Sequence, residues 1–264
     1  MLATDQIAEC AHRLYLARKS REPVAQLSRE FPGLVVEDAY SIQREWVRLE
    51  QLAGRSVRGY KVGLTAKALQ QALQATEPDY GPLLDDMMFE SDGEIRAQHF
   101  IAPRVEVELA FVLAQPLRGP GVTVDDVLRA TEYVTPALEI IDARIEQFDR
   151  ETRQPRKLVD VICDLAAAAG VVLGRVRVRP GQLDLRWTGA IVYKNEAIEE
   201  TGLGAAVLGH PAASIAWLAN QIAPGLQPGD VLLAGSFTKP VAAARGDAFR
   251  ADYGPLGTLS FKLT

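Results

Sequence analysis

The sequence has few of the residues that build disulfide frameworks and zinc sites. Its 264 residues include two cysteines, Cys10 and Cys163, and three histidines, His12, His99 and His210. Neither set has the spacing of a zinc motif, and two distant cysteines form no disulfide framework. We therefore expect a protein of a reducing, cytoplasmic compartment.

Long apolar runs and an excess of basic residues are also missing. No stretch approaches the roughly 18 apolar residues of a membrane-spanning helix, and residues 1–5 lack the basic and apolar segments of a signal peptide. Asp and Glu outnumber Lys and Arg by 34 to 29, for a formal net charge of −5. This balance gives no reason to expect a nucleic acid or an anionic membrane as a partner.

The apolar pattern predicts helices first and strands later. Apolar residues recur at helical spacing over residues 7–15 and 39–53. Residues 58–64 have the composition of a strand with glycines, residues 66–75 that of a short helix, and residues 79–82 that of a turn. These patterns favour an α+β fold.

Short strands separated by Gly and Asp turns dominate the sequence from about residue 100 onwards. We therefore divide the chain into a helical N-terminal portion, residues 1–90, and a β-rich catalytic core, residues 91–264. No linker composition separates the two, so one continuous domain is the alternative.

Two glutamates occupy one face of a predicted strand. Glu106 and Glu108 lie two residues apart within residues 104–113, RVEVELAFVL, so their side chains leave the same face. Alternation of this kind is also typical of a half-exposed sheet with a solvated face. Spacing alone therefore leaves both interpretations open.

A third glutamate lies between apolar residues on both sides. Glu139 belongs to residues 137–141, ALEII, where a lone charge is costly unless it is paired or binds a metal. A buried ion pair with Arg144 or Arg104 is one explanation. The other is that the three glutamates converge on a hard cation such as Mg²⁺ or Mn²⁺, which prefers oxygen ligands.

Four further residues are candidates for binding and proton transfer. Lys61 could stabilise the enolate of a 2-oxo acid, and Asp79 could act as an acid or a base; a surface lysine and a turn-capping aspartate are the alternatives. Ser236 and Thr238 follow a glycine and offer hydroxyl groups to a substrate carboxylate, or they form an ordinary polar loop.

The segments around these candidates resemble one known family. Over nearly its whole length the chain is similar to the hydratase/decarboxylase branch of the fumarylacetoacetate hydrolase superfamily. The matching segments are GYKVGLT at 59–65, EPDYG at 77–81, RVEVE at 104–108, PALEIIDAR at 136–144, GHP at 209–211, GSFT at 235–238 and the glycine-rich stretch at 246–257.

The resemblance implies a mixed β-roll-like core, a homo-oligomer and Mg²⁺, with Mn²⁺ as an alternative, held by Glu106, Glu108 and Glu139. It implies a lyase that adds water to a 2-oxo-enoic diacid through a metal-bound enolate, in the meta-cleavage catabolism of aromatic compounds such as homoprotocatechuate. Lys61 and Asp79 would then transfer protons.

Two local features bear on the substrate. The insertion at residues 149–157 favours a long diacid, and its basic residues Arg153, Arg156 and Lys157 are candidates for the distal carboxylate. Family members usually carry Asp-Asn where this chain has Asp164 and Leu165, so one amide that could hold a water or a substrate oxygen is missing.

Other activities of the same family remain open. A 4-oxalocrotonate-type decarboxylase or a 2-oxopent-4-enoate hydratase would use the same enolate. A C–C hydrolase of the acylpyruvate type would need an N-terminal His or Glu, and His12 lies on a predicted scaffold helix. A non-catalytic subunit that binds a 2-oxo acid is the remaining alternative.

Overall fold

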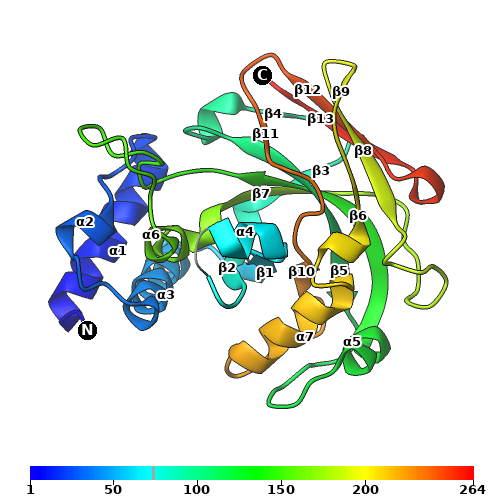
Figure 1. Ribbon diagram of the computed structural model, residues 1–264, viewed down its shortest axis with the longest axis horizontal. Helices are drawn as coiled ribbons and strands as arrows, with labels where there is room; N and C mark the ends of the chain where they lie inside the picture. Colours follow the sequence, from blue (N-terminus) through cyan, green and yellow to red (C-terminus); the bar gives the residue numbers. More distant parts are fainter. Residues whose placement is uncertain (73–74) are drawn as a thin grey trace.

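The N-terminal helices gather at one end of the molecule, beside two curved sheets (Figure 1). The computed structural model describes residues 1–72 and 75–264. Helices α1 (Thr4–Ser20), α2 (Leu27–Glu30) and α3 (Val36–Leu52) come first. On α3, Ala39, Ile42 and Trp46 are fully buried, and their spacing of three and four residues gives the helix one apolar face toward the core.

The larger sheet carries the segments that contain the candidate residues. Its strands run in the order β2-β1-β10-β5-β6-β7-β3, and β11 pairs with β5. Their bounds are β1 Val57–Gly63, β2 Asp79–Leu84, β3 Met88–Glu90, β5 Arg104–Leu113, β6 Thr131–Ile141, β7 Ala168–Leu173, β10 Val231–Leu233 and β11 Val241–Ala242. The sheet therefore joins strands from both halves of the sequence.

The smaller sheet has the order β4-β13-β12-β8-β9. Its strands are β4 Gly93–Ile95, β8 Gly189–Lys194, β9 Ala197–Leu203, β12 Ala248–Asp252 and β13 Thr258–Leu263. An apolar core between the two sheets includes Phe111 and Leu138 from the larger sheet and Phe249 and Phe261 from the smaller one. Burial of these large side chains is the main force that holds the sheets together.

Short helices connect the strands. They are α4 Lys67–Ala72, α5 Val124–Ala130, α6 Leu158–Cys163 and α7 Pro211–Gln221, with 3₁₀ turns η1 Asp85–Met87, η2 Ala97–His99, η3 Leu165–Ala167, η4 Gly204–Ala206 and η5 Gly254–Leu256. The predicted helix over residues 66–75 corresponds to α4, although residues 73–74 lie outside the described part. Pro211 stands in the first turn of α7, where its missing N–H costs nothing.

The turn predicted at residues 79–82 was wrong, because these residues begin strand β2. Pro82 pairs with Tyr60 of β1, and β2 is the edge of the larger sheet. An edge strand tolerates proline because one row of its backbone groups needs no partner in the sheet.

The division of the chain into residues 1–90 and 91–264 stays a prediction.

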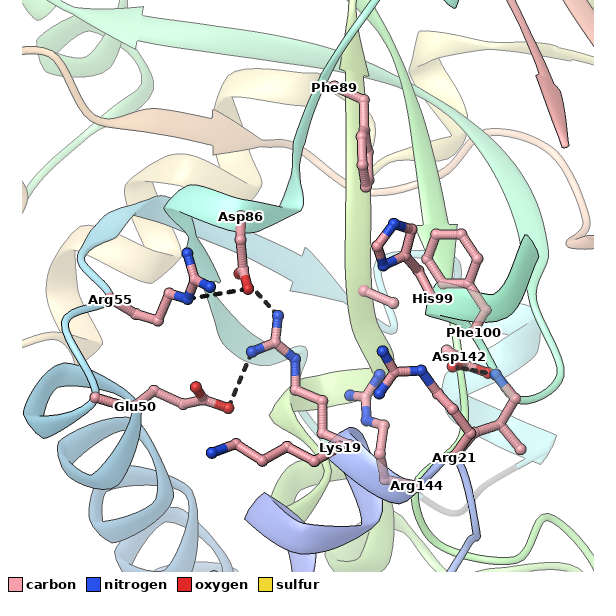
Figure 2. Close-up of a pocket in the computed structure, with 14 residues that line it drawn as sticks. Lys19, Arg21, Glu50, Arg55, Asp86, Phe89, His99, Phe100, Asp142 and Arg144 are labelled. Carbon is pink, nitrogen blue, oxygen red and sulfur yellow. Dashed lines mark hydrogen bonds and ion pairs between the residues drawn. The ribbon is translucent and has the colours of Figure 1, made fainter. Parts of the chain in front are cut away.

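Two cavities are relevant to function. One of about 470 Å³ opens beside Glu106 and Glu108 on the larger sheet. Another of about 440 Å³ lies against α1 and α3 and is lined by many basic side chains (Figure 2). Among the helices of residues 1–72 and 75–264, none combines the length and apolar character needed to cross a membrane.

Candidate active site

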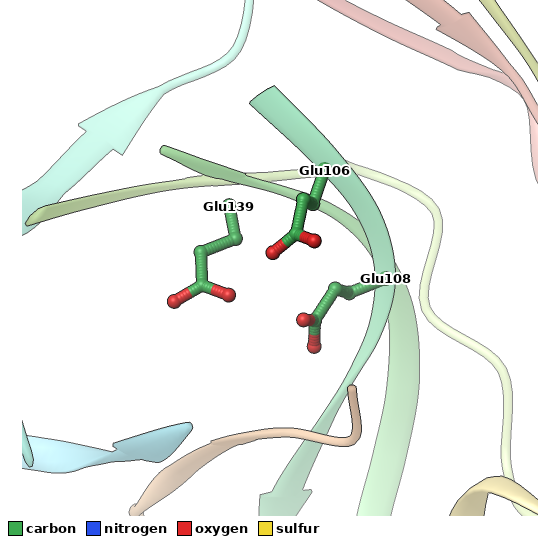
Figure 3. Close-up of side chains that lie close together, drawn as sticks. All are labelled: Glu106, Glu108 and Glu139. Atoms are coloured by element: carbon green, nitrogen blue, oxygen red, sulfur yellow. The ribbon is translucent and has the colours of Figure 1, made fainter. Parts of the chain in front are cut away.

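Strand pairing brings the three glutamates together (Figure 3). In the antiparallel pair β5–β6, Glu106 stands directly opposite Glu139, and Glu108 follows two residues later on the same face. One carboxylate oxygen from each lies within 4.8 Å of the others. Glu108 is 1% exposed and Glu139 is fully buried, whereas Glu106 is half-buried. The solvated-face interpretation of Glu106 and Glu108 therefore fails for Glu108.

The three carboxylates accept too few hydrogen bonds for all of them to be ionised without a further partner. Burial, followed by the charge of Glu139, raises the pKa of Glu106 to about 7 and that of Glu108 well above its usual value. Neither oxygen of Glu139 accepts a hydrogen bond from the described residues. A buried set of oxygen-only donors with unsatisfied lone pairs suits a hard divalent cation, so the residues fit the predicted metal.

Lys61 is the one cation in contact with this cluster among the described residues. It lies on β1 with its Nζ 3.2 Å from Oε2 of Glu139, and it donates a hydrogen bond of 3.1 Å to the carbonyl of Ala166. Burial alone would lower the pKa of Lys61, but the carboxylates of Glu139 and Glu106 raise it above its usual value. The lysine therefore stays charged.

The ion pair of Glu139 with Arg144 or Arg104, considered from the sequence, does not form. Arg144 instead binds the carboxylate of Asp164, and Arg104 donates to the side chain of Gln147. Glu139 is consequently free of any guanidinium.

Asp79 lies beside Lys61 because of the pairing between β1 and β2. Its partner across the strands is Gly63, while Lys61 pairs with Gly81. Asp79 is 2% exposed, and its Oδ1 has no hydrogen-bond partner among the described residues. Burial raises its pKa to about 6, although Lys61 opposes the shift. The carboxyl group can therefore change its protonation state near neutral pH.

Gly63 leaves the space in which these two side chains meet. A Cβ at this position would lie 2.1 Å from Oδ1 of Asp79 and 3.5 Å from Nζ of Lys61. The acid and the amine thus converge on the same point of the cavity wall, as a proton-transfer pair requires.

The loop after β10 supplies the opposite wall of the cavity. The backbone N–H of Gly235 donates a 2.7 Å hydrogen bond to Glu108, which fixes that carboxylate. Ser236 and Thr238 line the cavity and also bind the backbone of Val107. Their hydroxyl groups are held in place by strand β5, which carries Glu106 and Glu108.

The structure separates the three basic residues of the insertion. Arg156 lines the cavity of the glutamates. Arg153 lines a different cavity and stacks over Phe148, and Lys157 is exposed at the start of α6. The sequence reasoning missed Lys239, which lines the cavity; its position just after Thr238 was the available signal.

Asp164 is a second residue whose role the sequence did not reveal. Its buried carboxylate is bound by Arg144 at 2.6 Å and by Arg156 at 2.8 Å. The three residues that follow, Leu165 to Ala167, all have positive φ angles between 49° and 66°, which are costly for residues other than glycine. The ion pairs of Asp164 precede this turn, which presents the Ala166 carbonyl to Lys61.

Leu165 replaces the asparagine that the resemblance implies, and its side chain points away from the cavity. It is fully buried in the apolar cluster that contains Ile42 and Trp46. The cavity is lined at this place by Ala166 and Ala167 instead. These two alanines, and not the side chain of Leu165, make this wall of the cavity apolar.

Comparison with known proteins agrees with this geometry. The family model described as "Fumarylacetoacetate (FAA) hydrolase C-terminal" matches residues 62–264. The chain therefore belongs to the fumarylacetoacetate hydrolase family.

Several relatives are similar over almost the whole chain. A 2-oxo-hept-4-ene-1,7-dioate hydratase of Escherichia coli is 54% identical over 253 residues, which cover 95% of each protein. A 2-hydroxyhexa-2,4-dienoate hydratase of Comamonas testosteroni is 40% identical over 96% of this chain and 95% of the relative.

A solved structure confirms the fold. The 4-oxalocrotonate decarboxylase of Pseudomonas putida G7, in complex with magnesium and adipate, matches with a TM-score of 0.94. It is 31% identical in sequence, and the match covers 100% of this chain and 99% of that one. The helical N-terminal portion and the curled mixed sheets are thus those of the hydratase/decarboxylase branch.

Proposed function

We propose that the protein is a metal-dependent hydratase that adds water to a 2-oxo-enoic diacid of the 2-oxohept-4-ene-1,7-dioate type. The observation that carries the proposal is the convergence of three glutamates, two of them buried, beside Lys61 and Asp79 at one cavity. The 54% identity to a hydratase of that substrate supports it.

Glu106, Glu108 and Glu139 would hold the cation, for which we propose Mg²⁺ with Mn²⁺ as the alternative. When bound, the cation supplies Lewis-acid polarisation of the 2-oxo acid end of the substrate and stabilises the negative charge that develops there. The N–H of Gly235 orients Glu108, and the backbone contacts of Ser236 and Thr238 place two hydroxyl groups beside the substrate carboxylate.

Asp79 and Lys61 would move the protons. The carboxylate of Asp79, with Oδ1 free and a pKa of about 6, would take a proton from C3 of the 2-oxo-4-enoate and return it at C5, which moves the double bond into conjugation with the 2-oxo group. Water would then add at C4, and its proton would reach C3 through the same carboxylate. Lys61 keeps its charge and donates a hydrogen bond from Nζ to the substrate oxygen that becomes negative. The Ala166 carbonyl, 3.1 Å away, sets the direction of that Nζ.

The distal carboxylate of the diacid would bind at the basic rim of the cavity. Arg156 uses Nη1 for Asp164, and its other nitrogens have no hydrogen-bond partner among the described residues. Lys239 is exposed at the same rim. Between these cations and the glutamates lie apolar residues such as Ile141 and Val161, which suit the carbon chain.

The sequence also led us to expect a cytoplasmic location, a homo-oligomer and a role in homoprotocatechuate degradation. All three belong to this proposal. We keep them with the substrate proposal because they rest on the same family resemblance.

Product analysis tests the proposal against the decarboxylase alternative, which the structural match to 4-oxalocrotonate decarboxylase favours. The protein is incubated with Mg²⁺ and 2-hydroxyhepta-2,4-dienedioate, and separately with 4-oxalocrotonate. We expect the mass of one added water from the first substrate and no CO₂ from the second. Release of CO₂ without hydration would establish the decarboxylase instead.

A further inference from the structure

The cavity beside α1 and α3 lies outside the proposed active site and is rich in positive charge. Its wall contains five basic side chains besides His99 but only three carboxylates. The basic residues are Arg18, Lys19, Arg21, Arg55 and Arg144, and the acids are Glu50, Asp86 and Asp142. An excess of cations on a concave wall attracts an anion.

The three carboxylates are already engaged. Arg18 binds Glu50 at 2.9 Å and Asp86 at 2.7 Å, and Arg55 binds Asp86 at 3.2 Å. Asp142 accepts hydrogen bonds of 2.8 and 2.7 Å from two backbone N–H groups that follow η2. Asp142 forms no ion pair among the described residues, and its charge offsets part of the positive field at Arg21.

Lys19 contacts the hydroxyl group and ring of Tyr15, and Arg21 is the other cation of this wall that forms no ion pair among the described residues. Its Nε donates to the carbonyl of Gln98 at 2.8 Å, whereas its two terminal nitrogens have no partner within residues 1–72 and 75–264. Figure 2 shows this guanidinium inside the cavity, on the side of His99 and Phe100. Two free nitrogens on a planar group match a carboxylate, which binds arginine through two parallel hydrogen bonds.

The pKa shifts of Arg21 and His99 indicate the same excess of positive charge. Burial and then the charge of Arg18 lower the pKa of Arg21, and burial and then the charge of Arg21 lower that of His99. An anion in the space between them would stabilise the charge of Arg21 and raise the pKa of His99. The remaining wall is apolar, because Phe89, Phe100 and Ala169 line it.

We propose that this cavity is a second ligand site, which binds a small organic acid. The carboxylate of the acid pairs with the terminal nitrogens of Arg21, and its carbon chain lies against Phe89 and Phe100. A cavity of about 440 Å³ holds a chain of several carbons. This site is separate from the proposed function and does not depend on it.

Asp164, which is buried, contacts one arginine from the wall of each cavity. Arg144 lines the second cavity and Arg156 lines that of the glutamates, and both bind the carboxylate of Asp164.

Calorimetric titration of the metal-free protein tests the site without reference to activity. Hexanoate carries a carboxylate and an apolar chain, whereas acetate and inorganic phosphate lack the chain. We expect one equivalent of hexanoate to bind, at least tenfold more tightly than acetate or phosphate. Equal affinity for the three anions, or no heat with hexanoate at millimolar concentration, would overturn the proposal.

Variants locate the binding. The Arg21→Gln variant should bind hexanoate at least tenfold more weakly. Arg55→Gln, at a partly exposed position, should weaken binding about two- to fivefold, since this change removes a nearby positive charge but no direct contact with the carboxylate. Arg48→Gln, a surface arginine of α3 paired with Glu45, and Lys239→Met, in the other cavity, should bind normally. Unchanged binding in both Arg21→Gln and Arg55→Gln, with thermal unfolding showing folded protein, would refute the assignment.

Discussion

Glu106 and Glu139 stand directly opposite each other in the antiparallel pair of β5 and β6. Two like charges at facing positions destabilise a sheet, and here both lie in a buried cluster with Glu108. The arrangement is reasonable only for a protein that uses the charge. A bound cation would convert this repulsion into the strongest attraction of the site.

Removing one of the facing charges should therefore stabilise the metal-free protein. We expect Glu106→Gln at pH 8 to raise the free energy of unfolding by up to about 1 kcal/mol, or the unfolding temperature by about 2–4 °C for a chain of this size. The same change should weaken Mg²⁺ binding. Thermal unfolding with and without Mg²⁺ measures both effects. Glu132→Gln, an exposed position on β6, is the control, and a lower unfolding temperature for metal-free Glu106→Gln would contradict the account.

Metal affinity should increase with pH, because the ligands must lose their protons before they bind a cation. With the pKa of Glu106 at about 7, the affinity for Mg²⁺ should rise about tenfold between pH 6 and pH 8 from this group alone, with proton release. The raised pKa also means that the folded, metal-free protein binds more protons than the unfolded chain. Its stability should therefore fall as pH rises from about 4.5 through 7.

Titrations in two buffers of different ionisation enthalpy measure the protons released on binding. Glu106→Gln should release fewer protons than the parent protein. An affinity that does not change between pH 6 and pH 8 would show that the glutamates are already ionised without metal.

Lys61→Met should separate turnover from metal binding. The variant keeps the apolar stem of the side chain but removes the charge 3.2 Å from Glu139. We expect turnover to fall by about 10²–10⁴-fold, as for other groups that act in proton transfer, while Mg²⁺ binds more tightly because a neighbouring cation is gone. Steady-state kinetics and calorimetry give the two values. Lys262→Met, an exposed position on β13, should change neither, and normal turnover in Lys61→Met would remove this residue from the mechanism.

Arg156 and Lys239, at the rim of the active-site cavity, should contribute only to binding of the distal carboxylate of the substrate. Arg156→Met and Lys239→Met should each raise KM for the seven-carbon diacid by about tenfold, or about 1.4 kcal/mol. For a five-carbon substrate without the distal carboxylate they should leave KM nearly unchanged. Arg153→Met, whose side chain lines another cavity, is the matched control. An equal effect on both substrates would assign these residues to structure instead of specificity.

Only part of the glutamate cluster could be predicted from local sequence, because the spacing of Glu106 and Glu108 left a solvated face open until the family resemblance was considered. A charge at Glu139 between apolar neighbours needs an explanation wherever the strand lies. Asp79 is different, since its pairing with Gly63 across β1 and β2 depends on contacts between separate segments. Gly81 and Pro82 suggested a turn, and only the place of β2 at the sheet edge explains why they form a strand.

The link from Arg144 through Asp164 to Arg156 could not be predicted at all. Three charges from two loops meet in the interior, and no periodicity indicates which arginine approaches which acid. From the sequence, an ion pair of Glu139 with Arg144 or Arg104 was one of two explanations for its charge. The structure shows that Lys61, from a distant strand, is the cation that pairs with Glu139.

The most direct test of the account is the metal dependence of the variant in which Glu106, Glu108 and Glu139 are all replaced by Gln. Hydration of 2-hydroxyhepta-2,4-dienedioate is measured by mass over a range of Mg²⁺ concentrations, with Glu132→Gln as the control. We predict that the triple variant folds, that it binds no Mg²⁺ at millimolar concentration, and that its hydration rate does not respond to the metal. Full Mg²⁺-dependent hydration by the triple variant would contradict the proposed site.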